Sequence, residues 1–225
     1  MTDCYSQHPR FYVGVDCIIF SVSDGKLKVL LTKRQFEPEK GKWSLMGGFV
    51  AEDESVDDAA RRVLLELTGI HDPYMRQVKA FGEINRDPGA RVVSIAYYAL
   101  LTSDMIDEST LQSYGASWVD INNLPELGFD HPEMIQKARA QLCRRITSEP
   151  MAFRLLPEAF TLTQLQTLYE LIFDEQFDKR NFRKRVAENK CIEPTGLIDK
   201  SGSRRGAQLY RFNEEVFEAT GKLKL

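Results

Sequence analysis

The sequence predicts an α/β domain followed by a smaller domain of two helices and a β-hairpin. Three observations lead to this fold class. Runs rich in β-branched residues alternate with an amphipathic helix over the first 148 residues. Helix-breaking residues then cluster near position 150. Beyond them, two helical patterns precede two short strands. We therefore expect domains at residues 1–148 and 149–225.

The size and composition are those of an ordinary globular protein. The chain has 225 residues, of which 43% are hydrophobic and 28% charged, with a net charge of −3. These values exclude general disorder. The longest apolar run, at 95–101, falls short of the roughly 18 residues of a membrane span, and the first residues lack the basic region of a secretory signal. The cysteines and histidines are scattered, so we expect a cytoplasmic protein with no metal or cofactor.

The α/β domain begins with two predicted strands, at residues 13–20 and 27–31, joined by a turn at 23–26. Further strands are predicted at 92–101 and 118–121. Asp16 interrupts the apolar pattern of the first strand. We expect its carboxylate either to face a cleft or to pair with a cation.

A helix is predicted over residues 55–67, because apolar residues recur there at the i, i+3, i+4 spacing. Asp57 and Asp58 lie in its first turn, where the helix dipole favours negative charge. Gly69 is a residue type that commonly ends helices. A second helix, at 130–146, precedes the predicted linker, and its apolar residues are Met134, Ile135, Ala138, Leu142 and Ile146.

The first of these helices lies within a spaced motif. The pattern G-x5-E-x7-R-E-U-x-E-E-x-G-U, where U is bulky and apolar, is matched at Gly48, Glu54, Arg62, Leu64, Glu66, Gly69 and Ile70. Residues 43–49 also resemble the W-x-L-P-G-G segment that precedes this pattern, with Met46 in place of proline. The chain therefore resembles the Nudix hydrolases. This resemblance implies a Nudix α/β/α sandwich with a mixed sheet between helices.

The motif departs from the family pattern where the chemistry occurs. Nudix hydrolases cleave diphosphates with a divalent metal held by carboxylates, and these positions fall here on Val63, Glu66 and Leu67. Valine and leucine cannot ligate a hard cation. We therefore expect no catalytic residues, and an active hydrolase is the less favoured alternative. Glu54 and Arg62 are expected to pair across the motif.

The last 75 residues predict a helix–turn–helix. Thr161 and Gln164 form a potential capping box before one helical pattern, and Asp178 can cap a second helix that extends to about residue 188. Phe182 and Val186 share one face of this second helix. Most of the opposite face is basic, as a recognition helix in a DNA major groove requires.

Strands predicted at 192–198 and 207–212 flank a Gly-rich basic loop, an arrangement typical of a wing. Ten Lys or Arg residues and four Asp or Glu residues lie between Asp178 and Arg211. Wing cations contact phosphates or the minor groove. The expected DNA-binding residues are Lys179, Arg180, Asn181, Arg183, Lys184, Lys200, Ser203, Arg204 and Arg205. A small helical subdomain with a solvated basic face is the alternative interpretation.

The whole chain is similar to Nudix-related transcription factors, which join a Nudix-like domain to a C-terminal winged helix. One branch senses ADP-ribose and regulates NAD metabolism. Another branch, in gut bacteria, regulates pentose use, and its arabinose-responsive members resemble residues 36–38, 43–50, 53–60, 86–88, 91–99, 130–133 and 178–188. The resemblance implies a homodimeric repressor, a palindromic operator in double-stranded DNA and an effector that weakens DNA binding.

The candidate effector-binding residues come from segments that border the substrate cleft in Nudix folds. They are Asp16, Lys33, Trp43, Glu83, Arg86 and Asp87. An indole such as that of Trp43 can pack on the apolar face of a sugar, although core packing would also explain it, and salt bridges would explain the charged residues. Without metal to screen phosphates, the site favours a neutral sugar, although arginines could provide the same screening. We therefore expect L-arabinose as effector, with ADP-ribose as the alternative.

Overall fold

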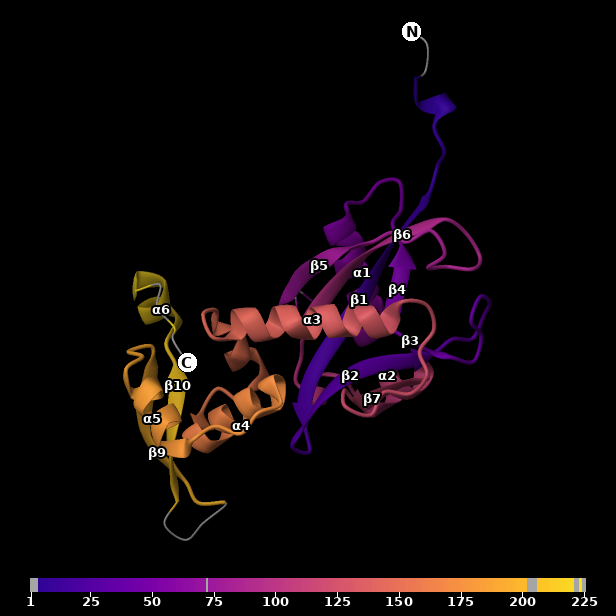
Figure 1. The fold of residues 1–225 in the computed structure, drawn as a ribbon. Coiled ribbons are helices and arrows are strands. Elements are labelled where there is room, and N and C mark those ends of the chain that lie inside the picture. Colours follow the sequence, from indigo (N-terminus) through magenta and orange to yellow (C-terminus); the bar gives the residue numbers. More distant parts are fainter. Residues whose placement is uncertain (1–3, 72, 202–205, 221–222, 224–225) are drawn as a thin grey trace. The chain divides into compact units, whose positions relative to one another are not determined.

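The computed structural model describes residues 4–71, 73–201, 206–220 and 223, and Figure 1 shows its fold. The chain divides into two compact units. The first consists of residues 1–19, 29–99 and 105–138, and the second of residues 20–28, 100–104 and 139–225. One boundary between them falls inside a helix, α3 (His131–Ile146), between Ala138 and Arg139.

A seven-stranded sheet forms the framework of the N-terminal part. Its main strand order is β3-β2-β1-β6-β5; in addition, β4 pairs with β1 and β7 with β2. The strands are β1 (Tyr12–Ser23), β2 (Lys26–Lys33), β3 (Trp43–Ser44), β4 (Met46–Phe49), β5 (Met75–Phe81), β6 (Val92–Leu100) and β7 (Ala116–Asp120). The strands predicted from sequence are confirmed, whereas β3, β4 and β5 were not predicted.

The turn between β1 and β2 shows why these two strands form a hairpin. Asp24 and Gly25 both adopt positive φ values, of 53° and 67°. A two-residue turn with left-handed residues matches the twist of the strands it joins, and Asp-Gly is a favoured sequence for it. The predicted turn is therefore confirmed.

Helix α1 (Val56–Thr68) lies within one residue of the predicted range, 55–67, and Gly69 follows its end as predicted. The Ser55 side chain accepts a hydrogen bond from the Asp58 amide, and Gly69, at φ 71°, donates its amide to the Leu65 carbonyl. Ala59, Ala60, Val63 and Leu64 are buried on its inner face. This face packs against β4, which brings the apolar stripe of the motif next to the strand that carries Gly47 and Gly48.

Two further helices complete this part of the chain. Helix α2 (Glu108–Ser113) is capped by Asp107, whose carboxylate accepts from the Thr110 amide; it was not predicted. Helix α3 (His131–Ile146) was predicted, and its expected apolar residues Met134, Ile135, Ala138, Leu142 and Ile146 are all buried. Short 3-10 helices occur at η1 (Cys4–Gln7), η2 (Ser103–Met105) and η3 (Pro150–Leu155).

The C-terminal unit contains the predicted helix–turn–helix and hairpin. Helix α4 (Leu162–Phe173) begins with a complete capping box between Thr161 and Gln164. Helix α5 (Lys179–Ala187) begins at Asp178, whose carboxylate accepts from the Asn181 amide. The strands β8 (Phe160–Thr161), β9 (Ile192–Asp199) and β10 (Ala207–Phe212) pair in the order β8-β10-β9, and α6 (Glu214–Thr220) follows (Figure 1).

Aromatic side chains dominate the core of this unit. Phe153 stacks on Phe212 with ring centroids 4.2 Å apart. Tyr169 is 1% exposed, and its hydroxyl donates to the Ile146 carbonyl at 2.8 Å. Burial raises the pKa of Tyr169. The buried hydroxyl therefore stays a neutral donor, and it fastens α4 to the last residue of α3.

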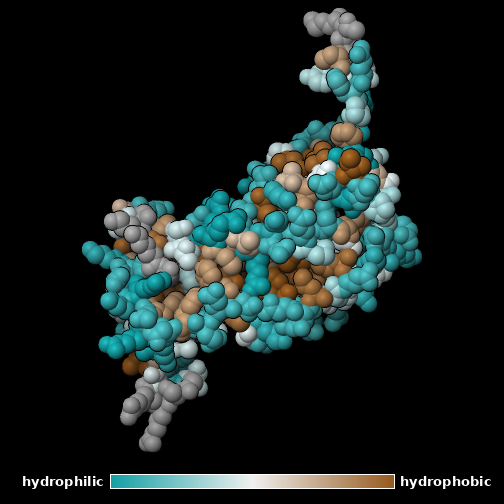
Figure 2. All heavy atoms as spheres, viewed as in Figure 1, coloured by the Kyte–Doolittle hydropathy of each residue, from teal (hydrophilic) through white to brown (hydrophobic). Residues whose placement is uncertain are grey.

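The visible surface is largely hydrophilic, with smaller hydrophobic areas between (Figure 2). None of the helices in the described part of the chain combines the length and apolar character needed to cross a membrane.

Candidate effector cavity and DNA-binding surface

A cavity of about 640 Å³ lies in the α/β unit. This volume falls within the roughly 300–1,000 Å³ of small-molecule sites. Of the six residues predicted from sequence, four line the cavity: Asp16, Lys33, Arg86 and Asp87. Trp43 and Glu83 are not among its lining residues. Instead, the Trp43 ring lies beneath the Lys33 ammonium, 5.4 Å from the ring centroid, and the Glu83 side chain is exposed.

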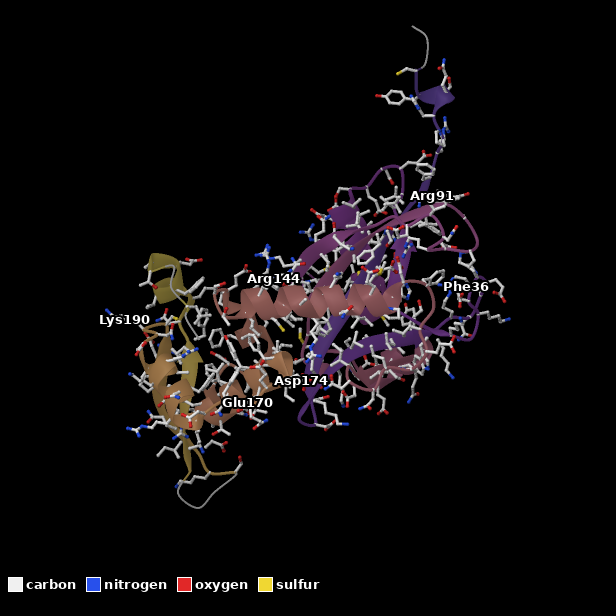
Figure 3. The ribbon with its side chains drawn as sticks, viewed as in Figure 1. Phe36, Arg91, Arg144, Glu170, Asp174 and Lys190 are labelled. Atoms are coloured by element: carbon white, nitrogen blue, oxygen red, sulfur yellow. The ribbon has the colours of Figure 1, made fainter. Side chains whose placement is uncertain are left out.

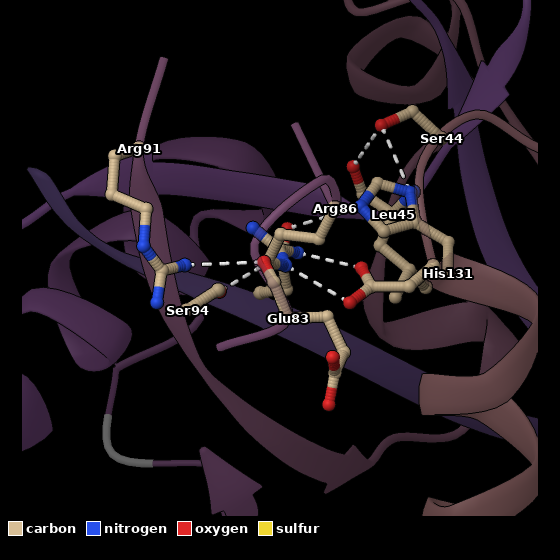
Figure 4. A network of polar contacts seen from close by, with 9 residues as sticks. Ser44, Leu45, Glu83, Arg86, Arg91, Ser94 and His131 are labelled. Carbon is tan, nitrogen blue, oxygen red and sulfur yellow. Dashed lines mark hydrogen bonds and ion pairs between the residues drawn. The ribbon is translucent and has the colours of Figure 1, made fainter. Parts of the chain in front are cut away.

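Asp16 contacts three polar side chains at this cavity, and Figure 4 labels these three, Arg86, Ser94 and His131. The Asp16 carboxylate accepts a hydrogen bond from the Ser94 hydroxyl at 2.6 Å. It also lies 3.5 Å from Nε2 of His131 and 3.6 Å from Nη2 of Arg86. Although burial by itself raises the pKa of Asp16, these three neighbours hold it below its ordinary value. Asp16 therefore lines the cleft and pairs with a cation, as the two sequence-based alternatives anticipated.

His131 was not predicted, yet it closes this network. The Leu45 amide donates to its Nδ1 at 3.1 Å, and the Ser44 hydroxyl lies 3.4 Å from the same nitrogen. An Nδ1 that accepts carries no proton, so the neutral ring holds its proton on Nε2, which faces Asp16. His131 is the first residue of α3, and it thereby links this helix to the β3–β4 segment.

Arg86 is held by a second carboxylate. Its Nε and Nη2 donate to the two carboxylate oxygens of Asp130 at 2.9 and 2.7 Å, a bidentate geometry that is among the strongest for ion pairs. The side chains are only 4% and 17% exposed. Burial lowers the pKa of Arg86, but Asp130 and Asp16 raise it above its ordinary value. The cavity therefore contains a permanent cation held in place by two acidic residues.

Aromatic rings and a second arginine form another wall of the cavity. The Arg34 guanidinium lies 4.8 Å from the ring centroids of both Phe36 and Phe129, and its Nε donates to the Pro38 carbonyl at 2.8 Å. Phe36 is 66% exposed although it lines the cavity, and Figure 3 labels it on the loop beyond β2. The cavity thus offers planar apolar faces beside positive charge.

Of the three positions at which the motif pattern led us to expect metal-binding carboxylates, two carry apolar side chains. Val63 is 2% exposed, and it packs so closely on Gly48 that a Cβ there would come within 2.8 Å of it. Leu67 lines the cavity. Glu66 lies 3.5 Å from the Arg62 guanidinium. Within the described residues, no group of three or more His, Cys, Asp or Glu side chains is placed to hold a metal ion.

The predicted pair within the motif is confirmed. Arg62 donates from Nε and Nη2 to the Glu54 carboxylate at 2.9 and 2.6 Å. These hydrogen bonds, with a further one from the Ala51 amide, lower the pKa of Glu54 to about 2. The side chains that the motif retains therefore bind each other.

The candidate DNA-binding surface is the outer face of α5. Phe182 and Val186 are buried against the unit, whereas the five polar residues predicted on this helix are all exposed: Lys179, Arg180, Asn181, Arg183 and Lys184. This confirms the predicted polarity of the helix. Lys200 is exposed beyond β9, and Ser203, Arg204 and Arg205 lie outside the described residues.

Comparisons with known proteins agree with both units. Residues 11–138 match the NUDIX domain family, and residues 152–212 match the NrtR DNA-binding winged helix domain. The chain is similar to the ADPR responsive transcriptional repressor NtrR of Acinetobacter baylyi, with 37% identity over 92% of this chain and 84% of that protein. It is also similar to crystal structures of Shewanella oneidensis NrtR.

The Shewanella oneidensis protein complexed with a 27mer DNA has a TM-score of 0.80 and 30% identity, over 92% of this chain and 95% of that one. Its NUDIX domain complexed with ADP ribose has a TM-score of 0.53 and 30% identity, over 63% of this chain and 99% of that one. The predicted Nudix α/β fold followed by a winged helix is therefore confirmed. The chain belongs to the Nudix-related transcriptional regulators that carry an NrtR-type DNA-binding winged helix.

Proposed function

We propose that this protein is a transcriptional repressor whose DNA binding is controlled by ADP-ribose. Residues 149–225 would bind operator DNA through α5 and the wing, and residues 1–148 would bind the effector. The observation that carries this proposal is the cavity of the Nudix unit, which combines an aromatic wall with three cations, Lys33, Arg34 and Arg86. Its cations suit a diphosphate, and its rings suit a base.

The same cavity favours ADP-ribose over L-arabinose, the effector expected from sequence. That expectation gave more weight to the missing metal than to arginines as the charge that screens phosphates. Arg86 and Lys33 line the cavity and can supply it. Trp43, the expected sugar platform, does not line the cavity. A volume of about 640 Å³ also suits a nucleotide sugar better than a single pentose. The similarity to an ADP-ribose-responsive repressor and to an ADP-ribose-bound Nudix domain supports this choice.

We further propose that the Nudix unit binds its ligand without hydrolysing it. A metal-dependent hydrolysis needs several carboxylates around a cation that activates water. Here Val63 is buried against Gly48 and Leu67 faces the cavity. Glu66, the carboxylate that remains at these positions, lies beside Arg62. The similarity to repressors supports the same conclusion.

For DNA binding we propose a homodimer on a palindromic operator. Two α5 helices would enter successive major grooves about 34–36 Å apart, as in other helix–turn–helix dimers. Arg180, Arg183 and Lys184 are the exposed cations of α5 best placed to reach bases and phosphates. ADP-ribose would favour an arrangement of the dimer that misplaces them.

Calorimetric titration tests the effector assignment. The wild-type protein is titrated with ADP-ribose, L-arabinose and D-xylose, each with and without Mg²⁺, and the ADP-ribose samples are then analysed for AMP and ribose 5-phosphate. We expect saturable, metal-independent binding of ADP-ribose, no cleavage products and no heat from either pentose. Binding of a pentose instead would overturn the assignment of ADP-ribose as effector. Mg²⁺-dependent cleavage of ADP-ribose would show that the protein is an enzyme.

A further inference from the structure

We propose that Asp130 transmits effector binding in the cavity to α3 and, through α3, to the winged-helix unit. This inference rests on the proposed function, because it assumes that an anionic effector enters the Nudix cavity. Asp130 itself was not predicted as a site residue. It acts through Arg86 and is therefore a positioning residue.

Asp130 makes one contact with the cavity and one with the helix. Its carboxylate binds Arg86, a cation that lines the cavity, in a bidentate pair. Its carbonyl accepts a hydrogen bond from the Met134 amide at 3.1 Å, the first bond of α3. Asp130 therefore occupies the N-cap position of the helix. At this position an aspartate side chain can accept from the amide of Glu133, since Pro132 has no N–H, yet here the carboxylate holds Arg86.

The other end of α3 belongs to the winged-helix unit. The Ile172 carbonyl, near the end of α4, accepts from Cys143 Sγ at 3.3 Å and from Arg139 Nε at 3.4 Å. The Tyr169 hydroxyl donates to the Ile146 carbonyl at 2.8 Å. A single helix thus begins at the cavity network and ends on the helix that precedes α5. A change in its first turn can therefore be transmitted to the DNA-binding unit.

The Arg86–Asp130 pair has two alternative arrangements. In the first arrangement, which the structure shows, two donor nitrogens of Arg86 are bound to Asp130. A diphosphate in the cavity competes for the same donors, since both are anions that favour a bidentate arginine. Released from Arg86, the Asp130 carboxylate can cap the first turn of α3. ADP-ribose then binds the capped arrangement more tightly than the Arg86-bound one. An effector shifts an equilibrium only through such a difference in affinity between two states.

The test separates effector binding from coupling. Asp130→Asn keeps the size and the capping ability of the residue but removes the charge that holds Arg86. The matched control is Glu133→Gln on the same helix, whose pair with Lys79 at 3.4 Å is about half exposed on both sides. Fluorescence anisotropy measures affinity for a duplex that the wild-type protein selects from a random-sequence library, with and without ADP-ribose. Calorimetry measures ADP-ribose affinity separately.

For wild type and Glu133→Gln we expect ADP-ribose to lower duplex affinity by about 5–150-fold, the usual range of allosteric coupling. For Asp130→Asn we expect ADP-ribose to bind at least as tightly as to wild type. The ratio of its duplex affinities without and with ADP-ribose should fall towards one. An Asp130→Asn variant that keeps the wild-type ratio overturns the inference. If ADP-ribose does not change the duplex affinity of the wild-type protein, the proposed function is overturned, and this inference with it.

A second measurement does not depend on how the variant folds. Hydrogen exchange of the wild-type protein is followed with and without ADP-ribose. A new cap on α3 slows exchange of the Glu133 amide, because a bound amide exchanges only after it opens. Glu133 is the amide that the cap can reach, since Pro132 has no N–H and the Met134 amide already binds the Asp130 carbonyl. Unchanged exchange at the Glu133 amide in the ADP-ribose-saturated protein contradicts the inference.

Discussion

Glu54 and Arg62 lie eight residues apart and are joined by two hydrogen bonds of 2.9 and 2.6 Å. The same guanidinium donates to the Phe49 carbonyl at 3.0 Å, so the pair fastens the end of β4 to α1. Phe49 lines the cavity. These two motif residues therefore hold the end of β4, and with it Phe49, in place beside α1.

The first prediction concerns the pH dependence of stability. The pKa of Glu54 is lowered to about 2 in the folded protein, against about 4.3 for an unperturbed glutamate. A lowered pKa stabilises the fold fully above the unfolded value, and this contribution is lost as the pH falls towards the folded value. Glu54→Gln should therefore lower the melting temperature at pH 7, and the deficit should shrink between about pH 4 and pH 2.

Thermal unfolding by circular dichroism at several pH values measures this difference. Glu52→Gln, an exposed carboxylate of the same loop, is the control and should leave the melting temperature nearly unchanged. A Glu54→Gln deficit that stays constant from pH 7 to pH 2 would contradict the assignment.

The second prediction concerns the aromatic wall. Phe36 is 66% exposed, so Phe36→Ala should leave stability nearly unchanged. If Phe36 stacks on the effector base, its loss should weaken ADP-ribose binding by about 1–3 kcal/mol, roughly 5–150-fold. Ile84→Ala is the matched control, because Ile84 is 73% exposed and is not among the cavity-lining residues. Calorimetry that finds equal affinities for the two variants would remove Phe36 from the site.

The third prediction concerns the DNA-binding surface. Arg183→Ala should weaken binding to the selected duplex by about 1–3 kcal/mol if Arg183 reads a base, and it should leave ADP-ribose affinity unchanged. Lys184→Ala should instead weaken binding to all sequences and reduce the salt slope by about one, as the loss of a phosphate contact does. Arg144→Ala, an exposed arginine of α3, is the control of equal charge. If all three variants bind alike in anisotropy titrations over a salt series, α5 is not the recognition helix.

The fourth prediction concerns the buried hydroxyl of Tyr169. Tyr169→Phe leaves the Ile146 carbonyl without its 2.8 Å donor, and an unsatisfied buried polar group costs about 1–3 kcal/mol. We expect this loss in urea unfolding. Tyr12→Phe, at a 61% exposed position, should change the free energy of unfolding by less than about 0.5 kcal/mol. Equal unfolding free energies for the two variants would show that the Tyr169 hydrogen bond makes no net contribution to the free energy of unfolding.

Prediction from sequence succeeded where local rules decide the structure. The predicted caps of α4 and α5 are confirmed, because the side chains of Thr161 and Asp178 accept from amides three residues further on. Strand β5 was missed because its exposure does not alternate: between Met75 and Phe81 only Phe81 is buried. Helix α2 was missed because it is short and has no buried residue.

The sequence by itself determined the Nudix fold, the winged helix that follows it, and helices α1, α3, α4 and α5, because helix periodicity, caps and motif spacing are local properties of the chain. The tertiary structure decided which side chains meet in the cavity. Arg86 and Asp130 are 44 residues apart, and Ser44 and His131 are 87 apart, so no local pattern could pair them. The effector expected from sequence, L-arabinose, gives way to our proposal of ADP-ribose for a related reason: the fold adds Arg34 to Lys33 and Arg86 at the cavity and leaves Trp43 out of its lining.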